Sequence, residues 1–198
     1  TVATTRLLNA AVEHKIKSFI FSSTAAVYGS GNGKDPLNEG SELKPLSPYG
    51  RSKLASEFML QDASDSHGLQ FGILRYFNVA GAGNDELGDS SVNNLIPMVF
   101  RALEEGKRPQ IFGDDYPTSD GTCIRDYIHV ADLADAHVVA AAFSEKSQAA
   151  DAFNVGRGVG SSVLEVMSMI GVARLPLCRC FRLRAHRCRV RRVRLLRA

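Results

Sequence analysis

The sequence contains no tryptophan, few cysteines and no long hydrophobic run. Only one of its four cysteines, Cys123, precedes residue 171, which excludes a disulfide-stapled miniprotein and fits a reducing compartment. No stretch reaches the roughly 20 apolar residues that cross a bilayer, and residues 1–17 lack the cationic start and apolar run of a secretory signal. With 44% hydrophobic and 23% charged residues among 198, disorder and collagen-like structure are also excluded, and we expect a globular cytoplasmic protein that does not enter the membrane.

Acidic residues are absent from residues 171–198, where ten arginines occur without a lysine. Residues 1–170 carry 14 basic and 21 acidic side chains, so the formal charge of +3 averages a body of −7 and a tail of +10. A GC-rich gene read out of frame enriches arginine in this way, and we predict that residues 171–198 are a non-native or frame-shifted tail. The alternative is selection for guanidinium groups, in which case the tail binds nucleic acid weakly, nonspecifically and in a salt-dependent manner. Phe181 is the only aromatic residue of the tail, which disfavours sequence-specific recognition.

Apolar periodicity and turn residues alternate along residues 1–170 in the order of a wound α/β domain. Short apolar runs predict buried strands, and segments with one apolar face predict helices. The expected strands are 19–21, 71–74, 110–112 and 152–155; the expected helices are 1–14, 48–66, one containing Leu95 to Leu103, 130–143 and one that opens at Ser161-Ser162. Strand, helix and strand at these intervals imply crossover connections, so we predict an α/β fold with a doubly wound parallel sheet.

Tyr49 and Lys53 form the sharpest local feature, because residues four apart on a helix share one face. A phenol with an ordinary pKa near 10 is a poor base at neutral pH, but a neighbouring ammonium favours the phenolate. Such a pair therefore suits the movement of a hydroxyl proton. Five tyrosines and seven lysines produce this spacing by chance often enough that the pair alone is weak evidence.

Hydroxyl side chains follow the first predicted strand, in Ser22-Ser23-Thr24. Open α/β sheets bind their ligands at the carboxyl ends of strands, although hydroxyls there are also ordinary caps. The segments FIFSSTAAVYG and SPYGRSKLASE together resemble the extended short-chain dehydrogenase/reductases that act on nucleotide sugars. Further segments, LRYFNVAGAG, VNNLIPMV, QIFGDDYPTSDGTCIRDYIHVADLADAH and FNVGRGVGSSVLEV, are similar to the UDP-glucose 4-epimerase family. This resemblance covers residues 1–170.

The resemblance implies a Rossmann-like fold and a set of site residues. It makes Tyr49 the proton acceptor and donor, Lys53 its cationic partner and a ribose contact, and Thr24 the hydroxyl that bonds the sugar oxygen. The other implied contacts are Phe77 to the nicotinamide of NAD, Asn78, Asn94 and Leu95 to the UDP-sugar, Gln110, Ile111 and Phe112 to the nucleoside, and Arg125 to the diphosphate. A local ion pair between Arg125 and Asp126 is the alternative for that arginine.

The activity implied by the resemblance is the interconversion of UDP-glucose and UDP-galactose. Tyr49 would take the proton of the 4-hydroxyl while hydride passes to a tightly held NAD, and hydride would return to the other face of the 4-keto sugar. Relatives pair as homodimers through a four-helix interface that includes the Tyr/Lys helix. We expect no metal site, since His129 and His137 have no ligand spacing around them that suits zinc.

The resemblance also divides the chain. Residues 1–77, completed by about 127–155, would form the C-terminal part of a dinucleotide-binding domain, and residues 78–126 and 156–170 part of a smaller substrate-binding lobe. The glycine-rich turn that seats the NAD pyrophosphate is not found, and in the family it precedes the point that corresponds to Thr1. We therefore expect Thr1 to be an interior point of a longer protein, and this chain by itself to be inactive.

Two other readings stay open from the sequence. A related nucleotide-sugar enzyme, such as a UDP-pentose 4-epimerase or a 4,6-dehydratase, would share the Tyr/Lys pair. A dehydratase needs a further acid/base pair beside Thr24, which Ala25-Ala26 do not supply. A non-enzymatic fragment whose basic tail binds nucleic acid is the second alternative.

Overall fold

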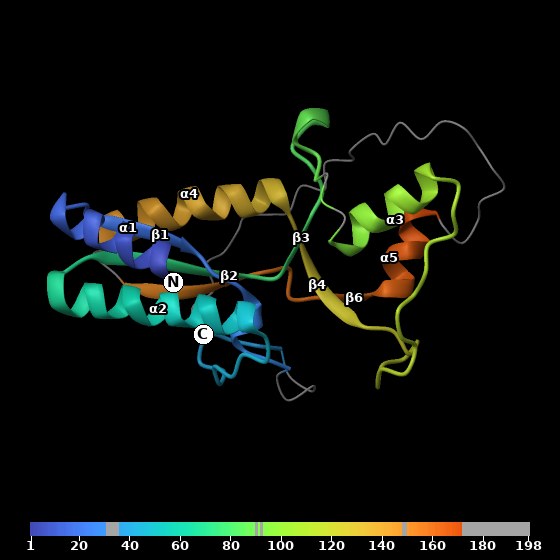
Figure 1. Ribbon diagram of the computed structural model, residues 1–198, viewed down its shortest axis with the longest axis horizontal. Coiled ribbons are helices and arrows are strands. Elements are labelled where there is room, and N and C mark those ends of the chain that lie inside the picture. The colour runs from blue at the N-terminus through green and yellow to red at the C-terminus, as the bar shows by residue number, and fades with distance from the viewer. Residues whose placement is uncertain (31–35, 90, 92, 148–149, 172–198) are drawn as a thin grey trace.

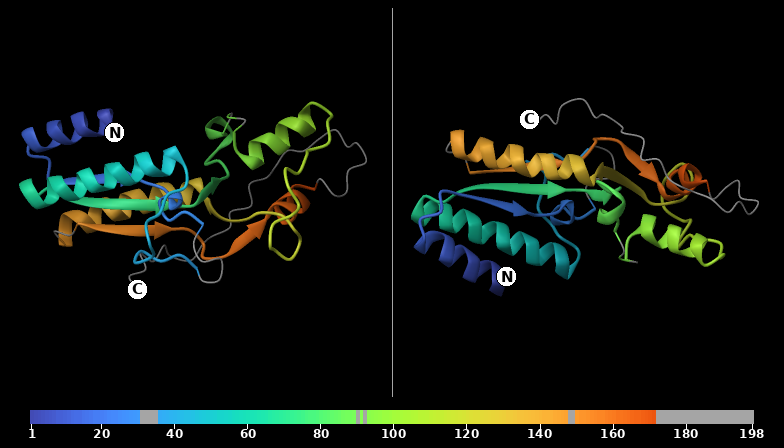
Figure 2. Two further views of the ribbon diagram at one scale, coloured as in Figure 1. Left: turned by 60° about the horizontal axis from the view of Figure 1, so that its bottom comes forward. Right: turned by 90° about the horizontal axis from the view of Figure 1, so that it is seen from above.

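The computed structural model describes residues 1–30, 36–89, 91, 93–147 and 150–171. Three parallel strands form its first sheet, in the order β1 (Ser18–Ser22), β2 (Gln70–Tyr76) and β5 (Asp151–Val155). Helices α1 (Val2–Glu13) and α2 (Pro48–His67) lie on one face of this sheet, and α4 (Val130–Ser147) lies on the other (Figures 1 and 2). The predicted α/β fold with a parallel sheet is confirmed.

The central strand β2 explains why both faces are covered. Successive side chains of a strand point to opposite faces, so Phe71 and Ile73 pack with Leu60 of α2 in one buried cluster. Leu74 points the other way and packs with Ala136 and Ala140 of α4 in a second cluster. Because both faces of β2 are covered, its sequence contains an apolar run rather than alternating apolar and polar residues, and that run predicted the strand.

Helix caps lie where the sequence places them. Ser47 precedes α2, and its Oγ accepts the N–H of Gly50 at 3.0 Å, with Pro48 in the first helical position. Helix α5 (Val163–Ile170) begins with a capping box, in which Ser162 and Glu165 bond each other's backbone N–H groups.

A second, mixed sheet lies beyond the carboxyl ends of the strands of the first sheet (Figure 1). Strand β4 (Ile124–His129) is central, with β3 (Asn78–Ala80) parallel to it and β6 (Gly160–Ser162) antiparallel. Helix α3 (Leu95–Glu104) and α5 lie beyond this sheet. The remaining helical turns are the short 3₁₀ helices η1 (Ala25–Val27) and η2 (Asp85–Leu87).

The strand predicted at 110–112 is wrong. These residues form no strand, and Phe112 is 75% exposed, so the apolar run has no sheet to join. Pro109 also deprives the segment of one backbone donor. The sequence interpretation of residues 172–198 falls outside the described part of the chain.

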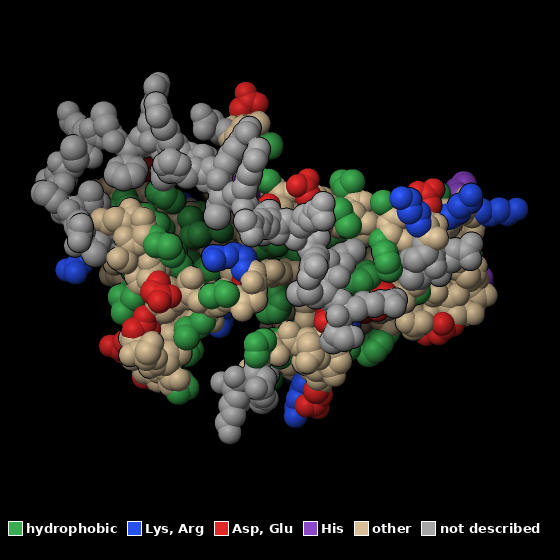
Figure 3. Space-filling model, turned by 180° about the vertical axis from the view of Figure 1, so that it is seen from behind, with side chains coloured by type: hydrophobic (Ala, Val, Ile, Leu, Met, Phe, Trp, Pro, Cys, Tyr) green, Lys and Arg blue, Asp and Glu red, His purple; other side chains and the backbone are tan. Residues whose placement is uncertain are grey.

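The face shown in Figure 3 carries acidic and basic side chains scattered among apolar and other polar ones. Several large apolar side chains are exposed in both parts of the molecule, among them Phe58 of α2, Val138 of α4 and Met169 of α5. None of the described helices is both long enough and apolar enough to cross a membrane.

Candidate active site

A cleft of about 1420 Å³ lies where the two sheets meet. One wall comes from the end of β1, the first turn of α2 and the end of β2. The other walls come from β3 and the chain after it, from α3 and from β4. Six of the eleven predicted site residues line this cleft: Thr24, Tyr49, Phe77, Asn78, Asn94 and Leu95. A seventh, Lys53, lies beside Tyr49.

Thr24 acts as a cap and still retains hydrogen-bonding capacity toward the cleft. Its Oγ1 accepts the N–H of Ala26 at 3.2 Å, at the start of η1. A hydroxyl can accept and donate at once, and this bond leaves its proton uncommitted. The cap and the proposed sugar contact are therefore compatible roles for one side chain.

Tyr49 lies in the first turn of α2 and is 53% exposed. One turn later, the Lys53 ammonium lies 5.9 Å from the centre of the Tyr49 ring and 5.0 Å from that of Phe21. Lys53 Nζ also donates to the Ser22 carbonyl at 2.9 Å. The ammonium is thus held at the carboxyl end of β1, beside the phenol of Tyr49.

Two further tyrosines line the cleft. Burial raises the pKa of Tyr76, and the neighbouring Tyr49 raises it further, although a hydrogen bond with Ser22 opposes both effects. Burial likewise raises the pKa of Tyr127, against a hydrogen bond with Asn78 and the charge of Arg125. Both phenols are therefore neutral hydrogen-bonding groups at physiological pH.

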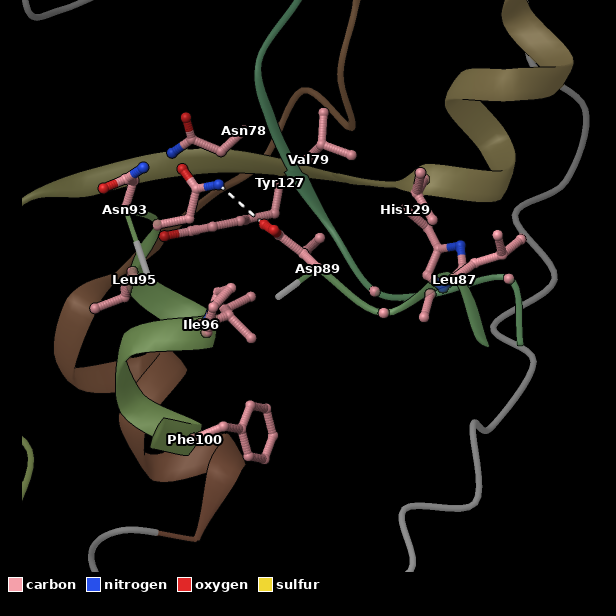
Figure 4. Close-up of a pocket in the computed structure, with 18 of the residues that line it drawn as sticks. Asn78, Val79, Leu87, Asp89, Asn93, Leu95, Ile96, Phe100, Tyr127 and His129 are labelled. Carbon is pink, nitrogen blue, oxygen red and sulfur yellow. Dashed lines mark hydrogen bonds between the residues drawn. The ribbon is translucent and has the colours of Figure 1, made fainter. Parts of the chain in front are cut away.

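Another wall of the cleft is built around the start of α3 (Figure 4). Asn94 precedes that helix, and its Nδ2 donates to the Asp89 carboxylate at 3.1 Å. The same carboxylate accepts the N–H of Ser91 at 2.9 Å. Hydrogen bonds from Ser91 and Asn94 lower the pKa of Asp89, so this carboxylate is charged at neutral pH and fixes the amide of Asn94.

The four remaining predicted site residues do not line the cleft: Gln110, Ile111, Phe112 and Arg125. Arg125 Nη1 donates to the carbonyl of Ile124 at 2.9 Å. The Asp126 carboxylate accepts the N–H groups of Arg157 at 3.0 Å and Gly158 at 2.8 Å. Each of these two side chains therefore bonds backbone groups, which differs from the local ion pair considered from the sequence.

Sequence reasoning missed Tyr76, Asp89, Tyr127 and His129 as lining residues. Tyr127 and His129 lie two apart on β4, so a strand over that segment would have placed both on one face. Asp89 follows a glycine-rich stretch with no periodic pattern, and no local signal identifies it. His129 is additionally the residue before α4, where its Nδ1 accepts the N–H of Ala131 at 3.1 Å.

The cleft brings together residues that the resemblance assigns to the reactive end of NAD. Thr24, Tyr49 and Phe77, which the resemblance assigns to that end, line one wall together, with Lys53 beside them. Within the described ranges no strand leads through a glycine-rich turn into a helix, so these residues include no cradle for the pyrophosphate. The same residues contain no group of three or more His, Cys, Asp or Glu side chains arranged to hold a metal ion.

Known proteins are similar to this chain in sequence and in fold. The UDP-glucose 4-epimerase of Halalkalibacterium halodurans is 46% identical over 172 residues, which cover 85% of this chain and 51% of the relative. The crystal structure of UDP-glucose 4-epimerase from Brucella ovis in complex with NAD superposes with a TM-score of 0.79 at 43% identity, covering 85% of this chain and 53% of that one. A Thermotoga maritima UDP-glucose 4-epimerase solved with UDP-glucose has a TM-score of 0.68 at 29% identity, over 88% of this chain and 54% of that one.

This chain therefore spans about half the length of the relatives that it matches. Residues 1–156 match the family described as the NAD dependent epimerase/dehydratase family. That match includes the strand-end hydroxyls, the Tyr/Lys helix and β4, all of which border the cleft. The chain belongs to the NAD dependent epimerase/dehydratase family and, within it, is homologous to the UDP-glucose 4-epimerases.

Proposed function

We propose that this chain supplies the acid–base wall and part of the sugar-nucleotide site of an NAD-dependent UDP-hexose 4-epimerase, which interconverts UDP-glucose and UDP-galactose. One observation carries the proposal. Thr24 and Tyr49 line one wall of a single cleft, with Lys53 beside Tyr49, while Asn78, Asn94 and Leu95 line the same cleft from the second sheet. The homology to UDP-glucose 4-epimerases supports the choice of substrate.

The chemistry of these residues is a proton transfer that is reversed within one turnover. Tyr49 accepts the proton of the sugar 4-hydroxyl, with the Lys53 ammonium beside it. The Thr24 hydroxyl donates to the same sugar oxygen as it becomes a carbonyl. NAD, when bound, supplies the acceptor for the C4 hydride and returns it. Tyr49 then gives the proton back. Because the hydride is also returned to the sugar, the reaction is redox-neutral.

The second wall holds the nucleotide part of the substrate. Asp89 binds the Nδ2 group of Asn94, which leaves the amide oxygen of Asn94 as an acceptor for a substrate hydroxyl or N–H. Contacts of Gln110, Ile111 and Phe112 to the nucleoside and of Arg125 to the diphosphate stay part of the proposal on the resemblance alone. We also propose that the complete protein forms a homodimer.

A hybrid enzyme tests this function. Residues 1–171 replace the matching segment of the Halalkalibacterium halodurans UDP-glucose 4-epimerase, and conversion of UDP-galactose to UDP-glucose is followed by chromatography. We expect turnover by the hybrid and none by the 198-residue chain supplied with NAD. Tyr49→Phe in the hybrid lowers kcat by about 100-fold or more, because no proton acceptor remains.

Tyr116→Phe is the matched control, since that tyrosine is 45% exposed and lies outside the cleft. It leaves kcat unchanged. A folded hybrid without turnover, or equal rates for the Tyr49→Phe and Tyr116→Phe variants, contradicts the proposal. Faster turnover of UDP-xylose than of UDP-galactose would instead assign the pentose reaction.

A further inference from the structure

Helix α2 contacts the segment that carries Thr24 through one stripe of residues, Gly50, Lys53 and Glu57. Positions three, four and seven apart on a helix share one face. Gly50 lies so close to η1 that an added Cβ would be 2.6 Å from the Ala26 carbonyl oxygen. Lys53 bonds the Ser22 carbonyl, and the Ser23 hydroxyl donates to Glu57 Oε1. Three successive turns of α2 are thus attached to residues 22–26.

Glu57 is buried, and its charge is balanced by Arg75 of β2. The two side chains are 4% and 7% exposed, with Arg75 Nη2 2.7 Å from Glu57 Oε2 and Arg75 Nε 3.2 Å from the same oxygen. Burial lowers the pKa of Arg75, but its hydrogen bonds to Glu57 and Tyr28 outweigh burial and leave it raised, so the guanidinium stays charged. The carboxylate is therefore held in one orientation, with Oε1 directed at Ser23.

Arg75 is itself fixed from its other side. Its Nη1 donates to the Tyr28 hydroxyl at 2.9 Å, and that hydroxyl donates to Asn154 Oδ1 of β5 at 2.7 Å. The network therefore runs from β5 through Tyr28, Arg75 and Glu57 to Ser23. No buried side-chain nitrogen or oxygen in the described part of the chain lacks a hydrogen-bond partner. A fully bonded buried network is rigid.

Ser23 lies between the two groups whose positions matter for the proton transfer. The residue before it provides the carbonyl that holds Lys53, and the residue after it is Thr24. A buried ion pair is weak evidence for a contribution to stability, because apolar residues of similar volume often serve equally well. Holding the Ser23 side chain, by contrast, fixes the peptide groups on both sides of it.

We propose that Glu57, oriented by Arg75, is a positioning residue of the active site that acts through Ser23. It sets the Thr24 hydroxyl and the carbonyl that holds Lys53 relative to the Tyr49 phenol. The inference rests on the proposed function of the cleft.

Ser23→Ala is the deciding variant, because it removes the attachment to the loop and leaves the Glu57–Arg75 pair in place. Amide hydrogen exchange of the 198-residue chain is followed by NMR, with Ser66→Ala, an exposed change on α2, as the control. We expect the amides of Ala26, Val27 and Tyr28, which close η1, to exchange about tenfold faster than in the parent. Amides of β5 should exchange as in the control, since the buried pair is retained.

Glu57→Gln is the second variant. It should increase the exchange rate of the same three amides by a larger factor than it increases the exchange rate of the β5 amides. In the hybrid enzyme, Ser23→Ala should lower kcat about tenfold with KM within twofold, because a small displacement of a reacting group affects the transition state more than binding. Exchange at residues 26–28 in Ser23→Ala that matches the Ser66→Ala control overturns the proposal. So does an unchanged kcat of Ser23→Ala in the hybrid enzyme. The exchange measurement needs no turnover, so it can be read even if the hybrid fails to epimerise UDP-galactose.

Discussion

Gly50 shows how one missing side chain shapes the site. The backbone of η1 approaches α2 at this glycine, and an added Cβ would also lie 3.0 Å from Pro45 Cβ. The obstructing Ala26 carbonyl belongs to a backbone that Thr24 caps, so it cannot rotate away as a flexible side chain would. The close approach of α2 to η1 therefore depends on a residue that contributes no chemistry.

We predict that Gly50→Ala destabilises the chain even though alanine favours helix over glycine by about 1 kcal/mol. The clash with Ala26 resembles overpacking, which costs about 1–3 kcal/mol, so the net change is a loss of up to about 2 kcal/mol. Urea unfolding followed by circular dichroism measures it. Gly88→Ala is the control, because its φ is −65° and no atom lies within 4 Å of the added Cβ. Equal midpoints for the two variants would contradict the predicted clash.

Single residues also show how far sequence reasoning reaches into a site. The spacing of Tyr49 and Lys53 on one helix predicts that they are neighbours, and the resemblance of the surrounding segments assigns the pair its role. Tyr76 and Asp89 come to the same cleft only because β2 ends there and the chain after β3 folds back over it. No local pattern encodes such a meeting. Arg125 is the opposite case, because a family motif assigns it a diphosphate contact, while in this structure its guanidinium bonds the adjacent carbonyl.

At the scale of elements, α2 serves the core and the site together. Its stripe of Gly50, Lys53 and Glu57 contacts the end of β1, while Leu60 is completely buried against α1 and β2. The helix therefore has one polar and one apolar attachment to the same sheet. The apolar one holds the helix on the sheet, and the polar one sets its position along the strand ends.

We predict that Leu60→Ala lowers the free energy of unfolding by about 2–5 kcal/mol, because it leaves a cavity among Leu8, Leu69 and Phe71. The measurement is urea denaturation of the 198-residue chain. Leu46→Ala, at a side chain that is 65% exposed, should change stability by no more than about 0.5 kcal/mol. A loss at Leu60 no larger than that at Leu46 would show that α2 is not docked by this cluster.

Strands differ in how well the sequence predicts them. The strands β1, β2 and β5 are continuous apolar runs buried under helices, and each was predicted within a few residues. Strands β3 and β6 have three residues each, and β4 begins with exposed Ile124 and Arg125, so none carries a periodic signal. Residues 110–112 have the apolar run without a partner strand. Pairing in the second sheet is decided by tertiary contacts rather than by propensity.

At the scale of the whole molecule, buried or half-buried phenols lie in or beside both sheets. Burial raises the pKa of Tyr28 and Tyr76 beside the first sheet and of Tyr127 in the second. The neutral phenol is favoured in the folded state, so its contribution to stability is complete below the unfolded pKa near 10 and is lost as pH rises through the folded pKa.

We predict that the free energy of unfolding falls as pH rises above about 10, by at most about 1.4 kcal/mol per pH unit for each such tyrosine. Urea unfolding at pH 8, 10 and 11 measures the decline. It should be shallower in Tyr28→Phe, which lacks one titrating group, than in Tyr116→Phe, where the tyrosine is exposed. Identical slopes for the two variants would exclude Tyr28 as a source of the alkaline sensitivity.

The chain crosses between its two sheets three times, at Phe77, at the junction of β4 with α4, and at residues 156–159. Two of these crossings touch, since a Cβ added to Gly156 would meet Phe77 and Asp126. The segment from residue 78 to residue 129 begins and ends on adjacent strands, because β3 pairs with β4. Insertions or deletions within this excursion can reshape the roof of the cleft while the register of β2 with β5 stays the same. Evolution can therefore alter the wall proposed to hold the nucleotide sugar without rebuilding the wall that carries Thr24 and Tyr49.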